Sequence, residues 1–140
     1  MKRKLLIAAW MLFLVTISLS AQDLTGTWVI NNTVVKQTID GITNTRSYAA
    51  NDQTDCYVIC PRKIVFVNQQ ATFELRDGSQ ESGGYQLQGN QLMWEIPAAR
   101  YTYQCKLQGG IIQLDYEIEY VIDGVRKAKE QCTFYGTPEL

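Results

Sequence analysis

The sequence predicts an all-β protein, an up-and-down antiparallel β-barrel of about eight strands, and three observations support this prediction. Short segments rich in β-branched and aromatic residues recur along the chain, separated by closely spaced turns with Gly, Asn or Asp. No convincing amphipathic helix follows the first 21 residues. The segment 111–122 alternates apolar and polar residues, so one face is buried and the other is wet. A long sheet of this kind usually closes to remove its edges, and eight strands enclose an interior that side chains fill or that holds one small ligand.

Residues 1–21 have the three parts of a cleavable secretory signal peptide. A basic start over 2–4 precedes an apolar run over 5–17 and the small residues Ser18, Ser20 and Ala21. The apolar run is shorter than the ~20 residues that span a bilayer, so we expect no stable membrane anchor. The remaining chain, residues 22–140, fits one domain. We therefore expect a periplasmic or secreted protein whose mature form begins at Ala21 or Gln22.

The strands of the domain are predicted in chain order. The first covers 27–37, where Asn31-Asn32 indicates a kink or a bulge, and a long polar connection over 38–62 follows, with room for a short strand over 45–49. A polar, glycine-bearing loop is expected over 77–83, and Gly89-Asn90 is suited to a tight hairpin turn. The other strands are predicted over 63–68, 71–76, 84–88, 91–96, 101–107, 111–122 and 125–135.

The last strand has two alternative registers, which depend on the turn at Asp123-Gly124. A two-residue turn would point Val125, Lys127, Lys129 and Gln131 inward and create a cationic interior suited to a carboxylate. A three-residue loop would instead point Arg126, Ala128, Glu130, Cys132 and Phe134 inward. We prefer the second register because it buries more apolar surface.

Four cysteines in an exported chain, Cys56, Cys60, Cys105 and Cys132, predict two disulfides. A metal site is less favoured because the chain has no histidine and two of the cysteines stand alone. Cys105 and Cys132 lie on strands separated by one other strand, hence about 9–10 Å apart and beyond the ~7 Å limit for a bridge. This favours cross-links from each to Cys56 and Cys60. The up-and-down order favours Cys56 with Cys60 instead, and we prefer the cross-links slightly.

Charge and composition exclude several function classes. Loss of the signal removes three of the 13 basic residues and none of the 14 acidic ones, so the mature chain has a net charge of about −4. A negative net charge of this size does not suit a protein that binds nucleic acid. Without histidine there is no serine or cysteine triad of the usual kind. The carboxylates of Glu117 and Glu119 fall on the wet face of a strand. We therefore expect no enzyme, no cofactor and no metal.

Three short motifs carry a resemblance to a known family. They are Gly26-Thr27-Trp28 at the first strand, Cys60 shortly before Ile64-Val65-Phe66, and the segment 84–92 across the middle hairpin. In these motifs the chain resembles the lipocalin-like domains exported by bacteria of the Bacteroides group, within the lipocalin and fatty-acid-binding superfamily. The resemblance covers nearly the whole mature chain. It implies a barrel that binds small apolar molecules.

Inward aromatic residues are the predicted binding site. A cavity wall is expected from Trp94, Tyr101, Tyr103, Tyr116 and Tyr120, with Trp28 closing the base of the barrel. The expected function is to hold a small apolar or aromatic ligand. In the alternative the rings fill a solid core, and the protein is an inhibitor or interaction protein that binds a protein partner through loops 38–62 and 77–83. A continuous interior cavity of ~300 Å³ or more would favour the first function.

Overall fold

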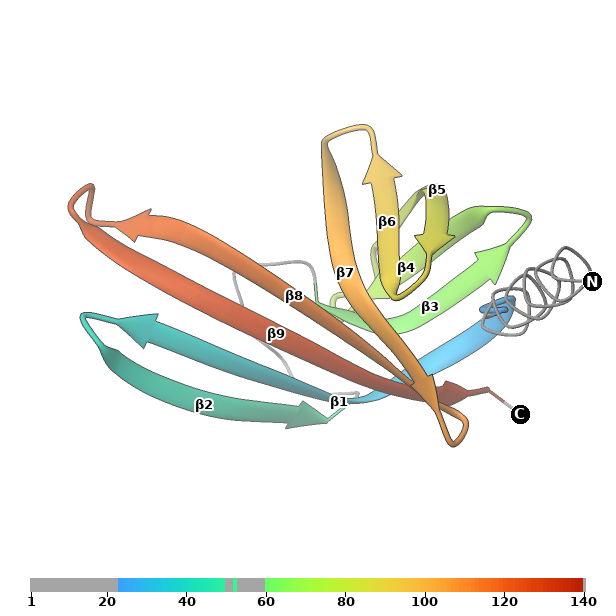
Figure 1. Cartoon of the computed structure of the whole chain (residues 1–140), viewed down its shortest axis with the longest axis horizontal. Helices are drawn as coiled ribbons and strands as arrows, with labels where there is room; N and C mark the ends of the chain where they lie inside the picture. The colour runs from blue at the N-terminus through green and yellow to red at the C-terminus, as the bar shows by residue number, and fades with distance from the viewer. Residues whose placement is uncertain (1–22, 50–51, 53–59, 140) are drawn as a thin grey trace, which may run out of the picture.

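The computed structural model describes residues 23–49, 52 and 60–139 of the 140-residue chain. These residues form nine antiparallel strands (Figure 1). The strands are β1 Gly26–Ile39, β2 Ile42–Ala49, β3 Pro61–Val67, β4 Gln70–Leu75, β5 Gln80–Gln88, β6 Gln91–Ile96, β7 Ala99–Gln108, β8 Ile111–Ile122 and β9 Arg126–Pro138. The predicted signal peptide over 1–21 lies outside the described residues. No helix in the described part of the chain is long and apolar enough to cross a membrane.

β1 closes the sheet into a barrel. Its residues 26–29 pair with β3, and its residues 28–39 pair with β9. From β3 to β9 each strand pairs with the next along the chain. β1 and β3–β9 therefore form a closed, up-and-down antiparallel barrel of eight strands, which confirms the predicted fold. β2 is a ninth strand, and it pairs with β1 alone.

A β-bulge at Asn31 changes which side chains of β1 face inward. The pairing with β9 shifts between Ile30 and Asn32. Before the bulge Trp28 and Ile30 are buried, and after it the buried residues are Thr33 and Val35. This confirms the irregularity predicted at Asn31-Asn32. A bulge bends its strand and increases the local twist, and β2 pairs with the part of β1 that begins at residue 32.

Two segments that were expected to be loops belong in part to strands. The connection expected over 38–62 starts with the end of β1 and all of β2, joined by a turn in which Asp40 and Gly41 have φ of 51° and 78°. The short strand expected over 45–49 falls within β2, which is longer. Positive φ at both turn residues suits the twist of a hairpin. β2 is exposed and mostly polar, so it lacks the apolar alternation that predicts a strand. The loop expected over 77–83 is shorter, because residues 80–83 pair with β4 as part of β5.

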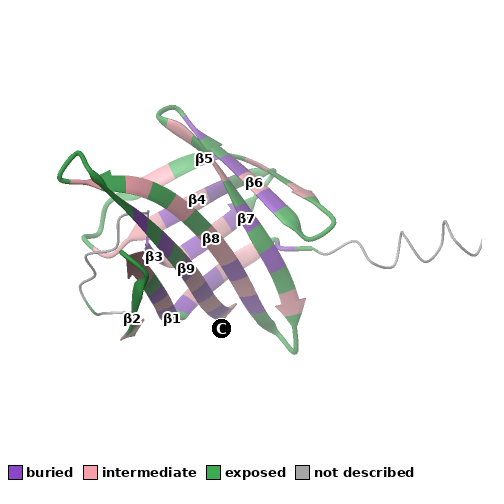
Figure 2. Ribbon diagram, turned by 60° about the vertical axis from the view of Figure 1, so that its left-hand side comes forward, coloured by how far each residue is buried: buried purple, intermediate pink, exposed green. Residues whose placement is uncertain are grey.

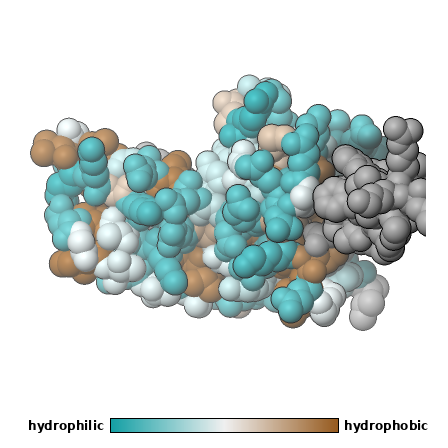
Figure 3. All heavy atoms as spheres, in the orientation of Figure 1, coloured by the Kyte–Doolittle hydropathy of each residue, from teal (hydrophilic) through white to brown (hydrophobic). Residues whose placement is uncertain are grey.

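Four strands continue beyond the barrel as an extension that we call the arm, residues 32–49 and 116–132 (Figure 1). The part of β8 over 116–122 pairs with β9 on one side and with no described strand on the other. At the far end, Arg126 lies 2.9 Å from Asp123 and 3.8 Å from Asp40, which links the two hairpin turns. Figure 3 shows hydrophobic residues at this end.

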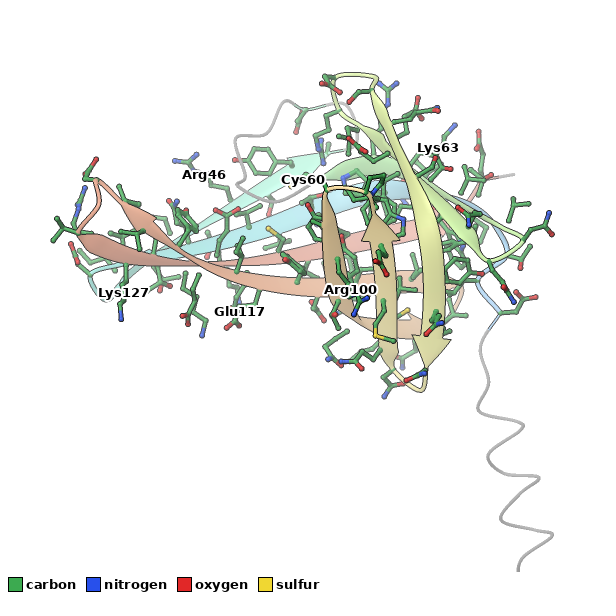
Figure 4. The ribbon with its side chains drawn as sticks, turned by 90° about the horizontal axis from the view of Figure 1, so that it is seen from above. Arg46, Cys60, Lys63, Arg100, Glu117 and Lys127 are labelled. Carbon is green, nitrogen blue, oxygen red and sulfur yellow. The ribbon has the colours of Figure 1, made fainter. Side chains whose placement is uncertain are left out.

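The loop between β8 and β9 has three residues, because Ile122 pairs with Arg126. The buried residues of β9 include Ala128, Glu130, Cys132 and Phe134. This confirms the preferred register. Lys127 and Lys129 are exposed, and Figure 4 shows Lys127 on the same side of the arm as Glu117, opposite Arg46. The cationic interior of the alternative register is therefore wrong.

Aromatic rings fill the middle of the barrel. Phe73 of β4 stacks on Trp94 of β6 with centroids 3.8 Å and planes 9° apart, and both are fully buried. The Trp94 indole donates a hydrogen bond to the Ala71 carbonyl at 2.9 Å. The Trp28 indole, also buried, donates to the Leu24 carbonyl at 2.8 Å. Figure 2 shows these buried positions as bands across the barrel strands, whereas the hairpin turns are exposed.

Candidate functional site

Three tyrosines meet where β7 and β8 separate, and we call them the tyrosine cluster: Tyr101, Tyr103 and Tyr116. Tyr101 and Tyr103 face inward because they alternate along β7. The pairing of β7 with β8 ends at Asp115, so Tyr116 is the first residue of β8 beyond it. The ring of Tyr116 lies 5.6 Å from that of Tyr101 and 5.3 Å from that of Tyr103, centroid to centroid.

The hydroxyl groups of the tyrosine cluster make no hydrogen bond with any protein group in the part of the chain that the structure describes. Tyr103 is only 1% exposed. Burial, and then the neighbouring Tyr101, Tyr116 and Cys132, raise its pKa well above the usual value. Burial also raises the pKa of Tyr116, with smaller contributions from Tyr101 and Cys132. The hydroxyls of Tyr103 and Tyr116 are therefore protonated at neutral pH and available to donate or accept hydrogen bonds.

A groove of about 380 Å³ borders the tyrosine cluster where β7 leaves β8, and its lining includes Tyr116 and Cys132. The rest of the lining comes from outward residues of β1, β7, β8 and β9, such as Thr102 and Gln104. The groove is within the size range of small-molecule sites, ~300–1,000 Å³. The groove is therefore lined by the ring of Tyr116 and the Cys132 thiol together with polar and charged side chains, among them Lys36, Asp115 and Glu117.

A line of polar groups continues from the tyrosine cluster along the arm. The Gln37 amide donates to the Tyr120 hydroxyl at 2.6 Å, and this hydroxyl donates to the Glu130 carboxylate at 3.1 Å. The Cys132 thiol donates to the other Glu130 oxygen at 3.6 Å. Glu130 is 2% exposed, so its carboxylate is a buried polar group that needs these partners. Sequence reasoning placed Glu130 inward but gave it no role.

The structure brings together four of the five residues that were predicted to line a cavity. Trp94 lies beside the tyrosine cluster, with its ring 5.6 Å from that of Tyr101. Trp94 is fully buried against Phe73. It can therefore support the rings that contact a ligand, but it cannot contact the ligand itself. Tyr120 lies apart in the arm, bonded to Gln37 and Glu130. Trp28 makes no ring contact with the tyrosine cluster and is held through Leu24 instead.

The prediction that Cys105 and Cys132 are oxidised is wrong, because both are buried free thiols. They face the interior from β7 and β9, with β8 between them. The preferred cross-links to Cys56 and Cys60 are therefore wrong too. Cys60 is disulfide-bonded, and Cys56 lies outside the described residues. Burial raises the pKa of Cys105 to about 11, which makes its thiol a poor nucleophile at neutral pH.

Metal-ligating residues do not gather in the described part of the chain: no three His, Cys, Asp or Glu side chains there could hold one ion. What the site offers is the ring and hydroxyl of Tyr116, amide and hydroxyl side chains, and charged groups from Lys36, Asp115 and Glu117. Comparison with known proteins adds no relative, since no family model, no curated protein and no solved structure matches this chain.

Proposed function

We propose that this chain is an exported, lipocalin-like binding protein without catalytic activity, which holds a small apolar or aromatic molecule bearing one polar group. The observation that carries the proposal is that Tyr116, whose hydroxyl bonds no described protein group, lines a groove of about 380 Å³ and is in ring contact with Tyr101 and Tyr103. The polar group of a ligand would bond this hydroxyl, and the ring would contact the apolar part of the ligand.

The ligand in this proposal binds at the end of the barrel and not in its middle. The stack of Phe73 on Trp94, with centroids 3.8 Å apart, leaves no space for a guest between them. Tyr101 and Tyr116 are only partly buried, so their rings are the accessible ones. Burying ~200 Å² of apolar surface at ~25 cal/mol per Å² gives roughly 5 kcal/mol before the cost of association, so micromolar affinity is the most we expect.

The test is a titration with retinol and with a fluorescent fatty acid, following probe fluorescence. Tyr116→Phe removes the hydroxyl that lines the groove and keeps the ring, so we expect affinity for a bound probe to fall by about two- to ten-fold, the value of one hydrogen bond. Tyr116→Trp adds bulk beside the groove and should abolish binding. Tyr135→Phe removes a hydroxyl on the other face of β9 and serves as the matched control, with affinity unchanged.

The second candidate function is that of an inhibitor or interaction protein that uses its loops. The solid, fully buried middle of the barrel favours it, because such a core needs no ligand. Part of the proposed loop surface, residues 50–51 and 53–59, lies outside the described residues. If neither probe binds the wild-type protein, the barrel is a scaffold and this second function replaces the first.

A further inference from the structure

A second groove, of about 890 Å³, lies on the outer surface near the turn between β3 and β4. Its walls come from that turn and from β5, β6 and the start of β7, where Figure 4 labels Arg100. Its lining includes Gln69, Gln70, Gly84, Gln86, Gln88 and Arg100. None of these residues belongs to the tyrosine cluster or to loops 38–62 and 77–83.

The groove arises because β5 changes partners in its middle. Residues 80–84 of β5 pair with β4, and residues 84–88 pair with β6. β4 begins at Gln70, so beyond Gly84 the edge of β5 next to β4 has no further strand pairing. The turn before β4 fills part of this space, and the Gln69 carbonyl accepts a hydrogen bond from the Tyr85 amide at 3.0 Å. The turn and the uncovered edge of β5 form two walls of the groove.

The chemistry of the lining fits a neutral, hydroxyl-rich ligand. Gln69, Gln70, Gln86 and Gln88 are exposed and lie in the lining, and each side-chain amide offers both donors and an acceptor. The two charged groups pair with each other, since Arg100 lies 3.1 Å from Glu95. The groove therefore has no unpaired charge to attract an ion. Apolar contact is available from Tyr85 and Met93, which also line it.

Gly84 is the second observation that indicates a ligand. Glycine weakens a strand interior, and it is often found where another backbone or a ligand approaches closely. Its neighbour Gly83 is required by packing, because a Cβ there would lie 1.8 Å from the Glu95 carbonyl oxygen. At Gly84 a Cβ would come no closer than 3.8 Å to its neighbours, and φ is not positive. The fold does not require glycine at 84, and its absent side chain leaves bare backbone on the groove floor.

We propose that this outer groove binds a neutral oligosaccharide, with the glutamine amides bonding sugar hydroxyls and the backbone at Gly84 allowing a sugar ring to approach closely. Each sugar hydroxyl can both donate and accept a hydrogen bond, and so can each glutamine amide. The apolar face of a sugar ring can pack against Tyr85 and Met93. The site is separate from the tyrosine cluster, so occupation of one does not require occupation of the other.

The experiment is a calorimetric titration of the folded protein with maltohexaose, cellohexaose, mannohexaose and xylohexaose. We expect at least one to bind, with affinity reduced about two- to ten-fold by Gln86→Ala or Gln88→Ala, the value of one hydrogen bond. Gly84→Val adds a β-branched side chain to the groove floor and should abolish binding. Gln108→Ala removes an exposed amide outside the groove and should change nothing.

Two outcomes would overturn the proposal. One is that none of the four sugars binds the wild-type protein at millimolar concentration. The other is that the glutamine variants bind a sugar as tightly as the wild type does. The glutamine side chains are exposed, so these two variants should fold and decide the question even if Gly84→Val does not.

Discussion

Gly83→Ala is the substitution whose effect can be worked out most directly from the structure. The added Cβ would lie 1.8 Å from the Glu95 carbonyl oxygen and 2.6 Å from the carbonyl carbon. Because the clash is with backbone, no side-chain rotation relieves it. A normal contact of about 3.5 Å requires β5 and β6 to separate locally by about 1.7 Å. Loss of about two ladder hydrogen bonds, at ~1 kcal/mol each, together with overpacking strain, predicts a loss of about 3–5 kcal/mol.

The neighbouring glycine is the matched control for this prediction. At Gly84 the nearest atoms, in Gln70 and Gln69, would be 3.8 and 3.9 Å from an added Cβ. Gly84→Ala should therefore change stability little, or raise it by about 0.4–1 kcal/mol through the unfolded state. Urea unfolding followed by tryptophan fluorescence measures both free energies. The reasoning is refuted if Gly83→Ala costs less than about 1 kcal/mol, or if the two variants are equally destabilised.

Three further predictions concern polar groups. Tyr120→Phe breaks the line from Gln37 to Glu130 and should cost about 1–3 kcal/mol in urea unfolding; no change would show that these bonds add nothing. Burial raises the pKa of the Cys105 thiol from 9.0 to about 11, so the folded state keeps a proton that the unfolded state loses. The stability of the wild-type protein should therefore fall as pH rises from 9 towards 11. The fall should be smaller in Cys105→Ala, and the urea midpoints of both proteins across that pH range measure it. Arg126→Ala removes two partly exposed ion pairs and should cost less than about 1 kcal/mol, so a larger fall in thermal stability would contradict it.

Local patterns explain most of the fold that the sequence predicts. The alternation of β8 gives the correct inward face, on which Ile112 and Leu114 are fully buried. Glycines mark the hairpin turns, since Gly89 and Gly109 have φ of 59° and 60°. The bulge at Asn31 and the three-residue loop before β9 follow from the same rules of pairing and register. These features depend on near neighbours in the chain.

Contacts between distant strands explain what the sequence does not predict. Tyr103 and Tyr120 are both tyrosines at inward positions of their strands. Tyr120 is bonded because Gln37 and Glu130 come from two other strands to meet it, and no such groups reach Tyr103. The prediction that Cys105 and Cys132 are oxidised failed for a related reason. An oxidising compartment favours pairing of thiols, but the barrel places Cys132 beside Glu130 and away from any partner among the described cysteines.

Burial of the tyrosine cluster is uneven. Tyr103 is 1% exposed, whereas Tyr101 and Tyr116 are only partly buried. Among the described residues, the Tyr103 hydroxyl is not one of the fully buried side-chain polar atoms that lack a hydrogen-bond partner. Phenylalanine fills fully buried inward positions at Phe73 and Phe134. Because Tyr116 is the member of the cluster that lines the groove, its hydroxyl, and not that of Tyr103, is the one that tests the proposed function.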